Sequence, residues 1–400
     1  MLFFSYLRAV TSPFFPLKGL YWSGSARSIS YFLHMIRISI HPHLQIRDDA
    51  SPGGEALDVS RLVALLGHIE ESGSISHSAQ AVSLSYRYAW GILRDAETLF
   101  GGPLIDKTRG RGSALTPLAQ QLVWASKRIG ARLSPTLDSL ASELEIELKK
   151  LMDQPEATAR LHASHGFAVA ALRDFLDEQQ VRHDLKYCGS VEAVAALAEG
   201  ACDIAGFHVP VGEFEHGMWR HFTTWLKPDT HCLVHLAVRS QGLFVRPDNP
   251  LGIHTLEDLT RREVRFVNRQ VGSGTRLLLD LMLAARGIDT ARIEGYSNGE
   301  FTHAAVAAYI GSGMADVGFG VETAARRFGL AFVPVIKERY FFAIERAKLR
   351  SAALAGAVDA LTSEAFRQRV NALPGYDGTL TGTVLTLEEA FPDYGTTPMR

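Results

Sequence analysis

The feature that most constrains the fold is a long alternation of short apolar runs with stretches of helical spacing, which starts near Arg160. Short runs of this kind predict strands, and the longer periodic stretches between them predict helices. The predicted strands are 161–163, 185–188, 203–207, 264–267 and 317–319, and the predicted helices are 167–176, 191–198, 303–310 and one that begins at Ser273. This alternation is typical of open, mostly parallel sheets with helices on their faces. It predicts a region of two lobes, at about 158–235 plus 332–400 and at 240–330.

Three of the predicted junctions between a strand and a helix carry glycines or hydroxyl side chains. Ligands of such sheets bind at the carboxyl ends of strands, where backbone N–H groups at helix starts favour an anion. Arg269 or Arg276 would add charge and a planar pair of donors. The predicted ligand-binding residues are therefore Ser164, His165, Ser190, Arg269, Ser273, Gly274, Thr275 and Arg276. As the alternative, the glycines only shape turns, and Ser164 and Ser190 are plain helix caps.

The segment 267–276, V-N-R-Q-V-G-S-G-T-R, lacks the lysine of a nucleotide-binding phosphate loop. Nothing nearby in the sequence pairs a nucleophile with a base, or offers two carboxylates suited to catalysis. His231 and His235 share one face of a predicted strand, but no carboxylate or cysteine accompanies them, so we predict no metal. The sequence predicts a protein that holds and releases an anion unchanged. We therefore expect neither an enzyme nor a cofactor.

A different pattern precedes the two lobes, over about 55–123. Leu62, Leu65, Leu66 and Ile69 recur at helical spacing before Gly73, and Ser74 or Ser76 can cap a second, short helix. A third helix is predicted at 86–100. It is followed by strands at 104–106 and 114–116, which flank a basic loop at 107–112. Three short helices and a basic hairpin predict a winged helix-turn-helix.

Charge supports a nucleic-acid surface on this head. Between residues 83 and 134 there are eight basic and three acidic residues, whereas the whole chain has a net charge of −2. Local basic excess supplies most of the non-specific affinity for DNA, and the start of a recognition helix meets base edges. The predicted DNA-binding residues are Ser85, Tyr86, Arg87, Arg94, Lys107, Arg109 and Arg111. A solvated basic face would explain isolated arginines equally well, and Tyr88 and Trp90 can simply pack in the core.

The segment 117–155 is predicted to be a linker and dimerisation helix. Thr116 and Pro117 make a good helix start, and leucines follow at spacings of three, four or seven residues. Pro135 is expected to kink or divide the helix. The alternative is a helix that packs on its own domain.

The remaining features concern the compartment and the amino-terminal region. The three cysteines, an odd number without a C-x-x-C motif, favour a reducing cytosol, so we predict a cytoplasmic protein. No apolar run is long enough for a membrane span. Residues 1–47 contain nine aromatics before Met35 and no acidic residue. We interpret them as a disordered extension or the product of an upstream start codon, with a signal peptide as the weaker alternative.

Two resemblances add to this interpretation. The run Ser85-Tyr86-Arg87-Tyr88-Ala89-Trp90, together with 73–76 and Leu115-Thr116-Pro117, resembles the head of molybdate-responsive transcription regulators and is similar to the LysR-type module. The strings at 241–245, 268–276 and 313–320 resemble the molybdate/tungstate-type periplasmic-binding-protein domain. That resemblance implies a two-lobed (type 2) effector domain in which Arg269 and Thr275 touch an oxyanion. The usual molybdate regulator carries a different, smaller effector module.

Together these features predict an α/β protein with an α+β head: a winged helix-turn-helix, a linker helix and a two-lobed periplasmic-binding-protein-like domain. The expected function is transcription regulation by a homodimer or homotetramer that binds double-stranded DNA and senses a small anion. That effector is an oxyanion such as molybdate or tungstate, or a small carboxylate. The alternative is a solute-binding protein for oxyanion transport, and an enzyme that uses the glycine-rich loop for phosphate is the third hypothesis.

Overall fold

The computed structural model describes residues 37–46, 56–108, 112–151 and 158–392. Most of the predicted extension, together with Arg109 and Arg111 of the predicted wing, lies outside the described residues. Within the described ranges, no helix combines the length and the apolar character that a membrane crossing requires.

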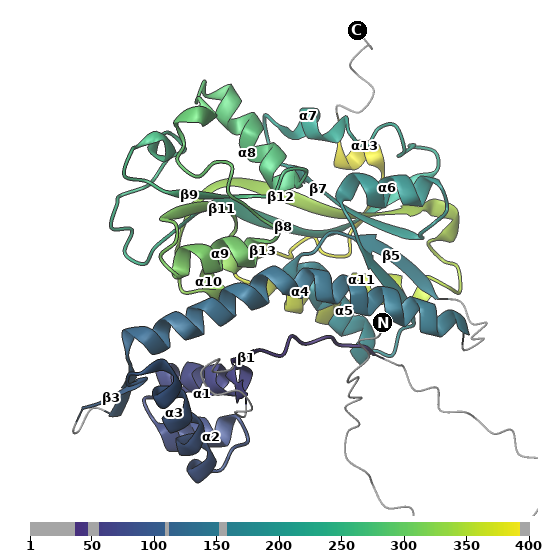
Figure 1. The fold of residues 1–400 in the computed structure, drawn as a ribbon. Helices are drawn as coiled ribbons and strands as arrows, with labels where there is room; N and C mark the ends of the chain where they lie inside the picture. Colours follow the sequence, from purple (N-terminus) through teal and green to yellow (C-terminus); the bar gives the residue numbers. More distant parts are fainter. Residues whose placement is uncertain (1–36, 47–55, 109–111, 152–157, 393–400) are drawn as a thin grey trace, which may run out of the picture. The chain divides into compact units, whose positions relative to one another are not determined.

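The head has the predicted order of three helices and a hairpin (Figure 1). After a short pair of strands, β1 (Gln45–Ile46) and β2 (Leu57–Asp58), come α1 (Val59–Ser72), α2 (Ile75–Ala81), α3 (Tyr86–Phe100), β3 (Ile105–Thr108) and β4 (Gly112–Leu115). The Ser74 hydroxyl caps α2 by accepting from the His77 N–H at 3.3 Å. Gly73 and Gly101 end α1 and α3 in the left-handed conformation, which glycine adopts without strain. The wing strands are longer than expected and include Lys107.

The linker is one continuous helix, α4 (Pro117–Leu151), and Pro135 lies inside it. The helix is therefore not divided at Pro135, and the kink that was the other expectation stays a prediction. A proline nitrogen cannot donate to the carbonyl four residues earlier, which here belongs to Ala131. The Thr302 hydroxyl, from the two-lobed domain, donates to that carbonyl at 3.2 Å. A tertiary contact therefore satisfies the acceptor that proline leaves open.

Each lobe contains parallel strands joined by helices (Figure 1). The first lobe consists of β5 (Ala159–Ala163), α5 (Phe167–Glu178), β6 (His183–Tyr187), α6 (Ser190–Ala198), β7 (Ile204–Pro210) and α7 (Glu215–Trp219). The second consists of η1 (Glu257–Thr260), β9 (Phe266–Arg269), α8 (Gly274–Ala285), η2 (Thr290–Arg292), β10 (Gly299–Glu300), α9 (His303–Gly311), β11 (Val317–Val321) and α10 (Glu322–Arg327).

Two long antiparallel strands, β8 (His231–Val245) and β12 (Ala331–Glu345), pass through both lobes. The sheet order is β10-β9-β11-β8-β12-β7-β5-β6, parallel at both ends and antiparallel at the centre. The strands at the centre of the sheet are antiparallel, whereas mostly parallel sheets were expected, and the expected boundary between the lobes at 235–240 falls within β8. Burial explains this continuity, since β8 is apolar and buried along most of its length and needs no turn there.

The carboxyl-terminal part of the chain follows β12. It contains η3 (Arg346–Lys348), α11 (Ala355–Thr362), α12 (Glu364–Asn371), β13 (Tyr376–Asp377), β14 (Val384–Leu385) and α13 (Leu387–Ala390). Leu361 and Phe366 share a core with Leu172 of α5 and Ile344 of β12, so this part completes the first lobe. The predicted fold class, an α/β two-lobed domain behind a winged helix-turn-helix head and a linker helix, is confirmed.

Candidate functional site

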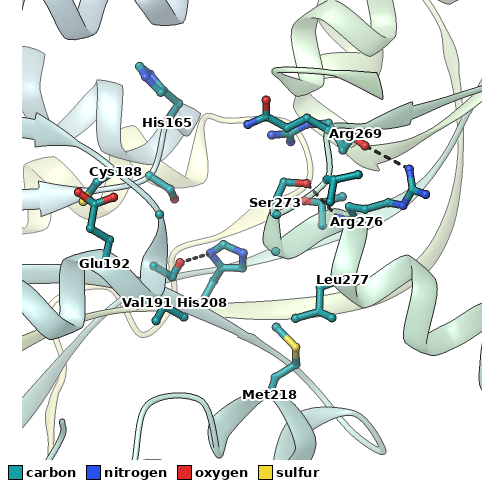
Figure 2. A pocket seen from close by; sticks show the side chains of 18 of the residues that line it. His165, Cys188, Val191, Glu192, His208, Met218, Arg269, Ser273, Arg276 and Leu277 are labelled. Carbon is teal, nitrogen blue, oxygen red and sulfur yellow. Dashed lines mark hydrogen bonds between the residues drawn. The ribbon is translucent and has the colours of Figure 1, made fainter. Parts of the chain in front are cut away.

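A cavity of about 570 Å³ lies between the two lobes. Its wall contains every one of the eight residues that the sequence singles out for ligand binding, from Ser164 to Arg276. Figure 2 shows His165 and His208 on the first lobe, across the cavity from Arg269, Ser273 and Arg276 on the second. Segments more than 100 residues apart in the chain therefore face one space.

Three helices begin at this cavity, and the local sequence explains why. α5 follows Gly166 after β5, α6 follows Gly189 after β6, and α8 follows Ser273 after β9. The first backbone N–H groups of a helix have no partner within the helix, so each start offers donors and the positive end of a dipole. The Ser273 hydroxyl accepts from the Arg276 N–H at 3.2 Å and still has its own proton to donate. The geometry suits an anion.

Gly274 is required at the closest approach of the two lobes. A Cβ at this position would lie 2.7 Å from Nε2 of His208, a distance that real structures do not tolerate. The alternative interpretation, in which this glycine only shapes a turn, therefore does not account for this contact. Gly274 also makes room for an imidazole from β7 of the other lobe.

Arg269 is the cation that the site leaves without a carboxylate. Its guanidinium donates to the backbone carbonyls of Glu300 at 3.3 Å and Phe301 at 2.8 Å. No ion pair among the described residues includes it within 4 Å of a carboxylate. Burial, and then the positive charge of Arg239, lower the pKa of Arg269 to about 10. A bound anion would relieve both effects, because it would supply the missing opposite charge.

The other two arginines of the cavity are compensated. Arg276 pairs with Asp280 at 2.9 Å and stacks on the Tyr296 ring at 3.9 Å. Arg239 pairs at 2.9 Å with Glu338, its neighbour across β8 and β12, and both side chains are buried. The charge argument from the sequence offered Arg269 or Arg276, and the family resemblance singled out Arg269. The contacts distinguish them, because the Arg276 charge is already used within α8.

Histidines around the cavity are held neutral. Burial lowers the pKa of His165 and of His208 to about 4, and lowers the pKa of His303 well below its usual range. Nδ1 of His208 lies 3.2 Å from the Ser190 hydroxyl, and the His165 ring stacks on Tyr187 at 3.9 Å. A neutral imidazole can either donate or accept a hydrogen bond. The lining therefore supplies directional polar groups without adding positive charge.

Sequence reasoning missed His208, Arg239, His303 and Glu338. His208, Arg239 and His303 lie in elements whose other residues are mostly buried, and Glu338 is itself fully buried, so their polarity stands out in those segments. A buried polar residue in a predicted core strand is a signal that could have been used. The sequence does not indicate which of these four residues contact one another, because they come from four different elements.

Three of the predicted DNA-binding residues, Ser85, Tyr86 and Arg87, lie at the start of α3, whereas Arg94 lies further along the same helix and Lys107 lies in β3. Ser85 caps the helix by accepting from the Tyr88 N–H at 3.2 Å, while Arg87 and Arg94 are exposed. Tyr86 is 54% exposed and meets the Trp90 ring edge-to-face. The surface at this helix start is therefore available to a partner.

The two aromatic residues for which packing was the alternative behave differently. Trp90 is partly buried against the core of the head, as that alternative expected. Tyr88 is exposed, and its hydroxyl accepts from Arg61 at 3.3 Å.

Comparisons with known proteins extend these observations. Residues 173–362 match a family model described as the PBP superfamily domain. The protein YvgK of Bacillus subtilis (strain 168) is 33% identical over 200 residues, which are 50% of this chain and 64% of YvgK. The molybdenum transport protein ModE of Herbaspirillum seropedicae is 40% identical over 70 residues, which are 16% of this chain and 26% of ModE. The chain therefore spans less than two thirds of either relative.

A solved structure is also similar to this chain. It is a mutant of Corynebacterium glutamicum OxyR with bound H2O2. The two sequences are 16% identical, the match covers 79% of this chain and 94% of the OxyR chain, and the TM-score is 0.40.

Proposed function

We propose that this chain, which belongs to the PBP superfamily through residues 173–362, is a transcription regulator. In this proposal it binds DNA and senses a small anion. The anion is an oxyanion of the molybdate or tungstate type, or a small carboxylate. The single observation that carries this proposal is the guanidinium of Arg269, which faces a cavity between two lobes without a carboxylate partner. The similarity to a molybdenum transport protein supports an oxyanion. The cavity volume and the neutral histidines suit a small carboxylate as well.

The linker helix offers a route from the anion to the head, because it contacts both lobes. On the second lobe, Arg132 forms an ion pair with the buried carboxylate of Glu300. On the first lobe, the Ser139 hydroxyl lies 3.3 Å from Nε2 of His165, and Lys149 pairs with Asp184 at 2.9 Å. Pro135 lies between these two sets of contacts. A change in the angle between the lobes would therefore act on α4 at its weakest point.

His165 on the cavity wall and Glu300, which contacts Arg269, also touch this helix. Glu300 supplies a carbonyl to Arg269 and a carboxylate to Arg132. His165 lines the cavity and contacts α4. An anion can bind more tightly to the conformation with one angle between the lobes than to the conformation with another. The difference in binding free energy then shifts the population of the two conformations of α4. Such coupling free energies are typically about 1–3 kcal/mol.

Exposed leucines on α4 suit a second copy of the chain. Leu133 and Leu140 are seven residues apart and are 39% and 48% exposed, and Leu151 is 81% exposed. A seven-residue spacing is the repeat of a paired helical seam. We therefore include a homodimer in the proposal, since one winged helix contacts too little DNA to be specific alone.

A thermal-shift screen tests the sensing half of the proposal. Molybdate, tungstate, sulfate and formate are added separately to the full chain, and an anion that binds the native state must raise the melting temperature. Sulfate also strengthens folding non-specifically, so chloride and phosphate series at equal ionic strength serve as controls. If none of these anions raises the melting temperature beyond the controls, an anion sensor is the wrong assignment.

A gel-shift assay tests the DNA-binding half. Duplexes selected by the wild-type protein from a random pool serve as the probe. The variant Arg87→Ala should bind them more weakly by roughly 1–3 kcal/mol if Arg87 contacts a base. The control is Arg262→Ala, an exposed arginine of the second lobe. Equal DNA affinity of Arg87→Ala and wild type would contradict the placement of the recognition helix.

A further inference from the structure

A second cavity, of about 540 Å³, lies where α4 passes over the two lobes. The linker helix contributes Lys127, Ala131, Pro135 and Asp138 to its wall. The first lobe contributes Phe167, Ala170 and Arg173, and the second contributes Arg327 and Phe328. Cavities of this size hold small organic ligands. Nothing in the proposed anion sensor requires this space.

The walls of this second cavity combine apolar surface with a cationic edge. The rings of Phe167 and Phe328, together with Ala131, Pro135 and Ala170, form its apolar part. The Arg327 guanidinium lies 4.3 Å from the centre of the Phe167 ring, and no ion pair among the described residues includes it. Arg173 is already paired, with Asp174 at 3.1 Å, and donates to the Tyr187 hydroxyl. Lys127 pairs with Glu70 at 3.8 Å, and Arg269 also lines the anion cavity. Arg327 is therefore the cation that lines this cavity alone and has no ion pair among the described residues.

This chemistry differs from that of the anion site between the lobes. There, hydroxyls and three helix starts lie around Arg269 and suit a compact, fully polar ion. Here, a polar ion would face the phenyl and alanine surfaces over part of the wall, and those surfaces offer it no hydrogen bonds. A molecule with a ring and one carboxylate would bury the ring against Phe167 and Phe328 and leave its charge at Arg327. Aromatic pairs and a charge-assisted hydrogen bond both favour that arrangement.

We propose that this cavity is a second ligand site, which takes a small aromatic monocarboxylate between the linker helix and the sensor. The second cavity shares part of its wall with the anion cavity, namely His165, Tyr187, Arg269 and His303. A ligand in one cavity therefore changes the affinity of the other for its ligand. A ring bound beside Pro135 would contact α4 and both lobes at once. The occupied site therefore holds the helix in its observed conformation and opposes a change in the angle between the lobes.

Calorimetric titration of the full chain tests the site, with salicylate and 1-naphthoate as probes and salicylamide as the uncharged control. Wild type should bind at least one of the two carboxylates and should bind the amide at least tenfold more weakly. Arg327→Gln should weaken carboxylate binding about tenfold, the value expected for a lost charge-assisted hydrogen bond. The matched control is Arg326→Gln, whose arginine is also exposed but pairs with Glu322 at 3.0 Å. This control should bind as wild type does.

Two further variants separate this site from the anion cavity. Ala170→Phe places a ring in the second cavity and should abolish carboxylate binding, while circular dichroism and the melting curve verify that the variant is folded. Thr275→Ala changes only the anion cavity and should leave carboxylate binding within about twofold of wild type. The proposal is overturned if neither probe binds, if Arg326→Gln and Arg327→Gln lose affinity equally, or if Thr275→Ala alone loses it. It is likewise overturned if folded Ala170→Phe binds as wild type does.

Discussion

At the scale of single residues, the charge balance of the anion cavity depends on Arg269. Arg239 and Arg276 have carboxylate partners, and burial keeps the histidines neutral, so these groups add little net charge. Arg269 donates only to two backbone carbonyls. In the proposed sensor, this one uncompensated and partly buried guanidinium would therefore favour a ligand of negative charge.

Removal of that charge gives the sharpest test at this scale. Arg269→Gln keeps a donor but loses the positive charge, and we expect at least tenfold weaker binding of whichever anion raises the melting temperature. This magnitude follows from about 1.5–3 kcal/mol for a hydrogen bond to a charged group. Isothermal titration measures the change, with the exposed Arg262→Gln as a control of equal charge. Unchanged affinity in Arg269→Gln would place the anion elsewhere.

The buried histidines make stability depend on pH. An unfolded histidine titrates with a pKa near 6.5, whereas burial lowers the pKa of His165, His208 and His235 to about 4 in the folded chain. Between these values the unfolded chain binds protons that the folded chain does not. The free energy of unfolding should therefore fall as the pH drops from about 6.5 to about 4, and these groups should have no effect above that window.

Urea denaturation at pH 7, 6 and 5 measures this trend. We expect the midpoint to fall with each step, and the fall to be smaller in His208→Gln because one buried imidazole is gone. Equal midpoints at pH 7 and pH 5 in wild type would show that these histidines are not held neutral.

At the scale of elements, α4 depends on the domain that it crosses. Proline breaks a helix that has no other support, yet α4 continues past Pro135 because Thr302 supplies a donor to Ala131. On one side of Pro135 the helix is held by Glu300, and on the other by His165 and Asp184. The helix therefore has a flexible point at Pro135, between its contacts with the two lobes. A change in the angle between the lobes would bend α4 at this point.

Restoring the backbone hydrogen bond at Pro135 should weaken the effect of the anion on DNA binding without weakening anion binding itself. Pro135→Ala supplies an N–H to the Ala131 carbonyl and stiffens α4. We expect anion affinity to stay within a few fold of wild type, while the effect of the anion on DNA affinity in a gel shift becomes smaller. Thr136→Ala, at the exposed neighbouring position, is the control. An undiminished anion effect in Pro135→Ala would mean that the signal does not pass through this point.

At the scale of the whole molecule, the proposed regulator needs two heads, and the exposed leucines of α4 are the surface that would bring them together. Leu133→Glu with Leu140→Glu places two like charges on each helix of the seam. We expect sedimentation to show a shift from dimer to monomer at micromolar concentration, with weaker DNA binding as a consequence. Gln121→Glu, exposed on the same helix, is the control. A dimer that survives the double substitution would be held by another surface.

Local sequence determined the elements of the head and most of those in the lobes. Gly73 and Gly101 end helices because of their left-handed backbone, and Ser85 begins α3 because its hydroxyl accepts a backbone N–H. These effects act within a few residues, so they can be read without the fold. The hydroxyl and glycine residues at the three strand-to-helix junctions were found in the same way. The alternation of strands and helices predicted the two lobes, and the family resemblance added the prediction that Arg269 and Thr275 touch an oxyanion.

Tertiary structure alone decided which of these residues act together. The charge argument from the sequence treats Arg269 and Arg276 alike, and only the position of Asp280 and Tyr296 shows that one of them is compensated. The long strand β8 runs through the expected boundary between the lobes because it is buried along most of its length. Thr302 meets Ala131 across 171 residues of chain. Contacts over such separations follow from packing, which a linear pattern of side chains does not contain.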